Sequence, residues 1–350
     1  MQHTPPTRPL GMTRRRMALA LPLLGAAAWL PSLAWASAAP AAVLRDARAL
    51  MGTRIDMVAE GSHPAAVRAA MAEAWHTMER LAAMMSRYEP GSAVSAVNRA
   101  AGGPAVAVPP EMMAVLQSAQ QLAERTHGAF DITVGALKAW HFDTGQTTLP
   151  DARTLEAQRR LVGYRGLLLD ARAGRARLAE RGMALDLGGA AKLPILEAGM
   201  QALRRHGIDN AMVNGGGDVL VAGQLNGRPW RVGLRDPRAP EKMLGVLALE
   251  GQAIVASSGD YERFFMVDGQ RQHHILNPAT GRPTHGPHGV GLLARDAASV
   301  NGLGTALMVL DRTGAQALLR TRPQVQALVA GRDGHLWQTP GMAARLQLTT

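Results

Sequence analysis

Residues 184–199, with the sequence ALDLGGAAKLPILEAG, combine an acid, two glycines and a lysine at a spacing that suits phosphate binding. An apolar strand is expected to end at Asp186, and the chain then turns through Gly188 and Gly189 into a helix that carries Lys192. A helix start offers unpaired N–H groups and a partial positive charge, to which a lysine adds a point charge. The segment predicts either a phosphate site or an ordinary strand–turn–helix with an exposed lysine.

A second candidate is the pair His273-His274, which precedes a turn at Pro278. A histidine at the end of an extended segment can act as a general base near neutral pH, or can simply lie on the surface. Neighbouring residues on a strand point to opposite faces, so the residues alone do not decide between the two. With His285 and His288 they could suggest a metal site, but this spacing fits no established zinc pattern.

Two further polar clusters each allow two interpretations. Asp131, in the run HGAFDIT, could accept hydrogen bonds from a sugar hydroxyl or a purine amine, or could cap a helix. The run NGGGD at residues 214–218 could form a backbone nest for an anion or a tight hairpin.

The elements that must position these residues alternate along the chain without repeats or a long linker. Apolar residues recur on one face of a predicted helix over residues 64–85. Further helices are expected over residues 110–126, 192–206 and 298–310, and strands over residues 51–60, 175–187 and 289–294. This pattern predicts an α+β or mixed α/β fold in a single domain over residues 41–350.

The N-terminus predicts export. The run TRRRM at residues 13–17 precedes an apolar stretch and a small-residue site at residues 36–38, which indicates a cleaved signal over residues 1–38. The paired arginines favour the twin-arginine route to the periplasm. Pro22, Gly25 and Pro31 interrupt the apolar run and argue against a membrane anchor. The chain has no cysteine, so a lipid anchor, a disulfide and cysteine catalysis are excluded.

The net charge is +11 with neutral histidines, and residues 1–38 contribute four arginines and no acid. The remaining excess of +7 suits an anionic small molecule such as a dinucleotide. Scattered arginines, with only three Tyr and four Phe, do not indicate nucleic-acid binding.

Seven motifs together, in order between residues 51 and 305, resemble the FAD:protein FMN transferase (ApbE) family. They are Met51-Gly52-Thr53, Ser86-Arg87-Tyr88, Ala129–Thr133, Asp186-Leu187-Gly188-Gly189-x-x-Lys192, Asn214-x-Gly216-Gly217-Asp218, Ser258–Tyr261 and His274-Ile275-Leu276-x-Pro278-x-Thr280-Gly281.

This resemblance implies an exported enzyme that cleaves the pyrophosphate of FAD, transfers FMN to a Ser or Thr hydroxyl of a partner flavoprotein, and releases AMP with the help of Mg²⁺. It implies contact with the membrane only through the acceptor protein. It assigns the role of base to His274. The FAD contacts that it implies are Met51, Tyr88, Ala129, Phe130, Asp131, Asp186, Lys192 and Leu276. The metal ligands that it implies are the Gly189 carbonyl and the side chains of Asn301 and Thr305.

The sequence departs from the family pattern at three places. Asn301 stands where the family usually has an aspartate, and losing that charge is expected to weaken Mg²⁺ binding by ~1–3 kcal/mol. Lys192-Leu193-Pro194 replaces Lys-Gly, and a proline there predicts that the helix starts later or sits differently. Ala279 replaces an arginine.

These departures keep alternatives open. One is an FAD-binding accessory or maturation protein that has lost most transferase activity, and a weaker one is a periplasmic solute-binding protein. The transferase remains the prediction because Lys192, His274, Asp186 and Thr305 are all retained.

Overall fold

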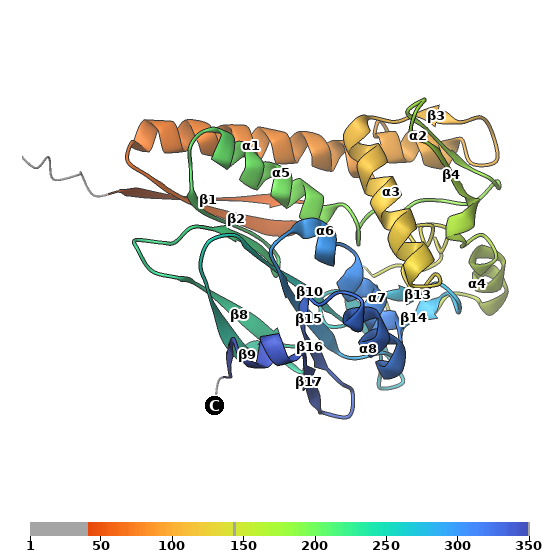
Figure 1. The fold of residues 1–350 in the computed structure, drawn as a ribbon. Helices are drawn as coiled ribbons and strands as arrows, with labels where there is room; N and C mark the ends of the chain where they lie inside the picture. Colours follow the sequence, from red (N-terminus) through yellow and green to blue (C-terminus); the bar gives the residue numbers. More distant parts are fainter. Residues whose placement is uncertain (1–40, 143–144, 349–350) are drawn as a thin grey trace, which may run out of the picture. The chain divides into compact units, whose positions relative to one another are not determined.

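An eight-stranded antiparallel sheet, in the order β1-β2-β6-β7-β10-β15-β16-β17, is the centre of the fold (Figure 1). The structure is a computed structural model and describes residues 41–142 and 145–348. The predicted signal over residues 1–38 lies outside the described residues. The central strands are β1 (Ala42–Leu50), β2 (Thr53–Gly61), β6 (Asn210–Gly215), β7 (Asp218–Ala222), β10 (Ala253–Gly259), β15 (Gly289–Ala294), β16 (Gln326–Ala330) and β17 (Leu336–Gln338).

Helices cover one face of this sheet and a second, smaller sheet covers the other (Figure 1). The helices are α1 (Pro64–Met85), α2 (Ala93–Arg99), α3 (Pro110–Arg125), α4 (Ala152–Arg159), α5 (Lys192–Arg205), α6 (Ala297–Val300), α7 (Leu303–Val309), α8 (Arg312–Arg320) and α9 (Pro340–Ala343). The small sheet has the order β18-β9-β8, with β18 (Leu346–Leu348), β9 (Ala239–Leu249) and β8 (Trp230–Asp236).

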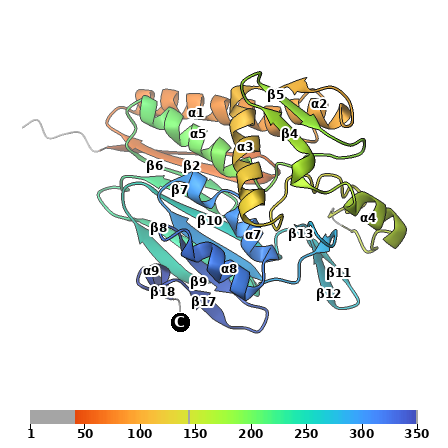
Figure 2. The ribbon, with the colours of Figure 1, turned by 45° about the vertical axis from the view of Figure 1, so that its right-hand side comes forward.

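Shorter strands lie at the periphery. They are β3 (Val106–Ala107), β4 (Leu167–Asp170) and β5 (Arg175–Leu178) in one sheet, the hairpin β11 (Phe264–Val267) with β12 (Gln270–His273), and the pair β13 (Leu276–Asn277) with β14 (Arg282–Pro283). A short 3₁₀ turn, η1, spans Tyr164–Gly166. Figure 2 shows the β11–β12 hairpin beside β13.

The core forms because α1 has the apolar stripe that the sequence predicts. Helix α1 spans the predicted residues 64–85, and Trp75 and Met78 on its inner face are fully buried. These side chains join a core cluster with residues of β2, α5 and α7, such as Ile55, Leu196 and Leu307. A single α+β domain, as predicted, therefore holds the described residues.

Glycine turns set the register of two hairpins. Gly216 and Gly217, with φ of +66° and +100°, form the two-residue turn between β6 and β7, so the tight-hairpin interpretation of residues 214–218 is correct. Met51 (φ +54°) and Gly52 form the corresponding turn between β1 and β2. A left-handed conformation is uncommon for a residue such as methionine.

Three sequence predictions of secondary structure need correction. The strand predicted over residues 51–60 begins at Thr53, after the turn. The predicted strand over residues 175–187 ends at Leu178, and Ala184 makes only an isolated bridge to Val134. The predicted helix over residues 298–310 is divided into α6 and α7, because Gly302 adopts a left-handed conformation.

The side chain of Asn98 bonds the backbone of Leu185, where the predicted strand is absent. Its Oδ1 accepts from the Leu185 N–H at 2.7 Å, and its Nδ2 donates to the Leu185 carbonyl at 3.0 Å. The amide thereby takes both backbone groups that a neighbouring strand would pair. Among the described helices, none is long and apolar enough to cross a membrane.

Candidate functional site

The segment from Asp186 to Lys192 is held by ionic contacts at both ends. At the first end, Arg87 Nη1 lies 2.8 Å from Asp186 Oδ2, and the Gly188 N–H donates to Asp186 Oδ1 at 2.8 Å. Gly188 and Gly189 are exposed in the turn that follows. Arg87 belongs to the motif Ser86-Arg87-Tyr88, but the motif alone predicted no role for this arginine.

Lys192 is the first residue of α5. The prediction from Pro194 that the helix starts later is therefore wrong. Pro194 lies in the first turn, where a backbone N–H has no intrahelical partner in any case. The Lys192 Nζ lies 2.7 Å from Asp218 Oδ2. Asp218 is buried, and its Oδ1 accepts from the Ser257 N–H at 3.0 Å. Asp218 is a second site residue to which the sequence analysis gave no role.

The predicted metal ligands lie around the same turn. A Cβ added to Gly189 would be 3.4 Å from Thr305 Oγ1 and 3.4 Å from the Phe130 ring, so these side chains pack against the glycine. Asn301 Nδ2 donates to the Ala190 carbonyl at 2.8 Å. The fold therefore brings α7 and the junction between α6 and α7 onto the turn that precedes Lys192.

The oxygen atoms of Gly189, Asn301 and Thr305 suit a cation such as Mg²⁺ that keeps several waters. A carbonyl can only accept a hydrogen bond, so the Asn301 nitrogen must face Ala190 and its Oδ1 points elsewhere as an acceptor. With the Thr305 hydroxyl and the Gly189 carbonyl, the set offers three neutral oxygens. Mg²⁺ is commonly held by few protein oxygens together with substrate phosphates. No cluster of three or more His, Cys, Asp or Glu residues suited to a metal occurs in the described part of the chain.

Asp131 has a local structural role in this structure. Its Oδ1 accepts from the N–H (2.8 Å) and the hydroxyl (2.6 Å) of Thr133, and its Oδ2 accepts from the Tyr164 N–H at 2.7 Å. This is an Asx turn rather than a helix cap. Burial raises the pKa of this carboxyl group, against those hydrogen bonds. Phe130 is also buried, and its backbone N–H donates to Thr126 Oγ1 at 3.2 Å.

Met51, Tyr88 and Leu276 are the predicted FAD contacts with large apolar side chains. Tyr88 is 75% exposed, and its ring lies 5.1 Å from the Arg87 guanidinium carbon. The turn that contains Met51 adjoins the β6–β7 turn, because Thr53 packs against Gly216. Leu276 is partly buried in β13, two residues after His274.

His274 is held in a form that can accept a proton. Both its backbone N–H (3.1 Å) and its Nδ1 (3.4 Å) face the Arg263 carbonyl, which requires the proton of the neutral ring to be on Nδ1. The lone pair is then on Nε2. Burial, with the charges of Arg263, His273 and Lys192, lowers the pKa of His274 to about 3.

His273 and His288 have structural partners. His273 is fully buried, and its Nε2 donates to the Thr284 carbonyl at 3.0 Å, while burial lowers its pKa. His288 Nδ1 lies 2.7 Å from Asp260 Oδ2. These contacts distinguish His274 from its neighbour, which the sequence alone could not do.

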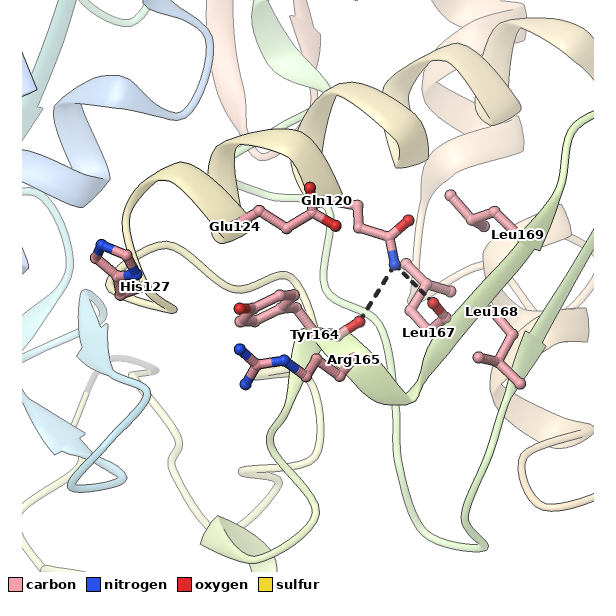
Figure 3. Close-up of a pocket in the computed structure, with 8 residues that line it drawn as sticks. All are labelled: Gln120, Glu124, His127, Tyr164, Arg165, Leu167, Leu168 and Leu169. Carbon is pink, nitrogen blue, oxygen red and sulfur yellow. Dashed lines mark hydrogen bonds between the residues drawn. The ribbon is translucent and has the colours of Figure 1, made fainter. Parts of the chain in front are cut away.

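A depression of about 580 Å³ lies elsewhere, between α3 and the segment that contains η1 and β4 (Figure 3). Gln120 crosses it and donates to the carbonyls of Tyr164 (3.4 Å) and Leu167 (2.7 Å). None of the predicted site residues lines this depression.

Comparisons with known proteins show the family to which this chain belongs. The model of the ApbE family matches residues 51–329. A Treponema pallidum protein named FAD:protein FMN transferase is 32% identical over 321 residues, covering 86% of this chain and 88% of its own length.

Two solved structures have the same fold. The crystal structure of an ApbE protein from Thermotoga maritima is 30% identical, with a TM-score of 0.77 over 87% of this chain and 99% of the other. The flavin transferase ApbE from Vibrio cholerae is 26% identical, with a TM-score of 0.78 over 88% of this chain and all of the other. The chain therefore belongs to the ApbE family.

Proposed function

We propose that this protein is an FAD:protein FMN transferase that moves FMN from FAD to a Ser or Thr hydroxyl of an acceptor flavoprotein and releases AMP. The observation that carries the proposal is the turn from Asp186 to Lys192, which Arg87 and Asp218 hold by ion pairs at its two ends and against which Thr305 and Asn301 pack. Family membership and the name of the Treponema pallidum relative support the same activity.

The diphosphate of FAD would bind at the start of α5. The helix spans Lys192–Arg205, and its first N–H groups and its dipole favour an anion. The Lys192 ammonium has three N–H donors. One of them faces Asp218 Oδ2, so two remain for phosphate oxygens. Asp218 thereby orients the lysine rather than neutralising the site.

The flavin would lie near Tyr88. An aromatic side chain that is 75% exposed gains from stacking on a flat apolar ring, and Arg87 supports it from one side. Because Arg87 also binds Asp186, the aromatic residue and the phosphate-binding turn are linked through one side chain.

His274 would act as the general base. The acceptor hydroxyl oxygen forms a bond to the FMN phosphorus, the bond from that phosphorus to the bridging oxygen breaks, and AMP leaves. The hydroxyl proton passes to His274 Nε2. A low pKa makes the imidazole a modest base but keeps it unprotonated at neutral pH.

Asn301, Thr305 and the Gly189 carbonyl would hold Mg²⁺. The ion, when bound, would supply positive charge that stabilises the negative charge developing on the diphosphate as its P–O bond breaks. The neutral donor set also favours a second candidate function, an FAD-binding accessory protein with little transferase activity, because the protein then contributes no ligand charge of its own.

The compartment is proposed from the N-terminal sequence. The run TRRRM, the apolar stretch after it and the small-residue site support export to the periplasm by the twin-arginine route. The acceptor would then be a periplasmic protein or a membrane protein with a periplasmic domain.

Transferase activity is tested with the purified protein, FAD, MgCl₂ and an acceptor domain whose modification by the Treponema pallidum protein is measured in a parallel reaction. We expect AMP release and an increase in acceptor mass equal to one FMN, both measured by mass spectrometry. Tight FAD binding without AMP at any Mg²⁺ concentration would instead establish the accessory function.

Lys192→Ala and His274→Ala should have separable effects. The lysine variant loses a charge on the diphosphate and should raise the dissociation constant for FAD by about 10-fold or more, as expected for a charge-assisted hydrogen bond. The histidine variant should bind FAD normally but transfer FMN about 10²–10⁴-fold more slowly. Titration by flavin fluorescence and single-turnover transfer measure the two quantities. Equal losses of both in His274→Ala would contradict its role as base.

The pH profile follows from the direction of the His274 pKa shift. Since its pKa is lowered to about 3, the imidazole remains neutral as the pH falls through the ordinary value near 6.5. We expect kcat/KM for FAD, which reports the free enzyme, to show no acid loss centred near pH 6.5. A loss there that disappears in His274→Ala would mean that the imidazole titrates normally.

Asn301→Asp should lower the Mg²⁺ concentration needed for half-maximal transfer, because it restores a ligand charge worth ~1–3 kcal/mol. It should also reduce the free energy of unfolding in the absence of Mg²⁺, since a carboxylate cannot donate to the Ala190 carbonyl. Asn226→Asp, at an exposed position in the loop between β7 and β8, serves as control. An unchanged Mg²⁺ requirement would remove residue 301 from the metal site.

A further inference from the structure

Asp260 is a fully buried carboxylate that has no role in the proposed binding of FAD or in the proposed transfer of FMN. It follows β10 directly, and the Arg271 Nη1 lies 2.5 Å from its Oδ1. His288 Nδ1 lies 2.7 Å and Arg332 Nη2 3.6 Å from its Oδ2. A buried charge of this kind is tolerated when it is paired on every side, and removing its charge leaves the partners uncompensated.

The partners of Asp260 lie on both sides of His274 in the sequence. Arg271 is on β12, three residues before His274, and His288 immediately precedes β15. The Asp260 N–H also donates to the His288 carbonyl at 3.0 Å. The single carboxylate therefore fixes the beginning and the end of the segment 272–287, which includes His274.

Three more hydrogen bonds hold the later part of that segment. Arg332 donates to the carbonyls of Gly286 (2.8 Å) and Thr284 (3.4 Å). The buried imidazole of His273 donates to the same Thr284 carbonyl at 3.0 Å. The backbone on either side of His274 is thus tied to groups that Asp260 orients, whereas the imidazole of His274 bonds only the Arg263 carbonyl among the described residues.

We infer that Asp260 is a positioning residue, which acts through Arg271, His288 and Arg332 to hold the His274 imidazole in place for proton transfer. This inference rests on the proposed function, since it needs His274 to act as the base. It gives Asp260 no contact with FAD: Lys192, Asp186 and Gly189 are on other elements, and none of them bonds Asp260.

The test is a double-mutant cycle with Asp260→Asn and His274→Ala in the full chain. In the wild-type background, Asp260→Asn should slow single-turnover FMN transfer by about 10- to 100-fold, the loss expected from a displacement near 1 Å. The dissociation constant for FAD should not change. In the His274→Ala background, Asp260→Asn should cause no further loss, because both changes remove the same step.

The control is Asp236→Asn, which removes a carboxylate from the more exposed pair with Arg238 and should leave transfer unchanged. If Asp260→Asn does not fold, Arg271→Lys keeps the charge but alters the geometry, and a smaller loss with the same dependence on His274 is expected. A loss of equal size in both backgrounds, or a matching loss of FAD affinity, would overturn the inference.

Amide hydrogen exchange separates this inference from the proposed function. Asp260→Asn should speed exchange in residues 274–288 and leave the start of α5 unaffected. If the wild-type protein transfers no FMN, the proposed function fails while this measurement still reports on the segment. Unchanged exchange there would show that Asp260 does not hold it.

Discussion

The ion pair between Lys192 and Asp218 is the contact on which the candidate site depends. A lysine at the start of a helix would otherwise extend into solvent, and a buried aspartate would carry an uncompensated charge. Their 2.7 Å contact resolves both problems and joins α5 to β7. Because Asp218 also accepts from the Ser257 N–H, β10 is bound to the same pair. The direction of the ammonium is therefore fixed before any ligand arrives.

The same positive charge contributes to the state of His274. Burial is the largest cause of its low pKa, and the charges of Arg263, His273 and Lys192 act in the same direction. A diphosphate at Lys192 would offset part of that charge, and the imidazole would become a stronger base once the substrate is bound. In the proposed function, anion binding at the start of α5 would therefore raise the basicity of an imidazole on the segment after β12.

Sequence reasoning succeeded where the determining interactions are local. The apolar stripe of residues 64–85 and the two-glycine turn at residues 216–217 depend on neighbours within a few positions. It failed where a distant side chain replaces a backbone partner, as Asn98 does for Leu185 across 87 positions. The ion pairs of Arg87 with Asp186 and of Lys192 with Asp218 were missed for the same reason, since no short pattern specifies which charges will meet.

The departures from the family pattern have different physical weight. Pro194 costs little, because the first turn of α5 requires no N–H from it. Asn301 has a local benefit, because its nitrogen satisfies the Ala190 carbonyl in the turn before Lys192, which an aspartate could not do. The amide therefore provides a hydrogen bond to the turn before Lys192 at the expense of a negative charge at position 301. In this chain the charge that balances a cation would have to come from the diphosphate, so metal and FAD would bind best together.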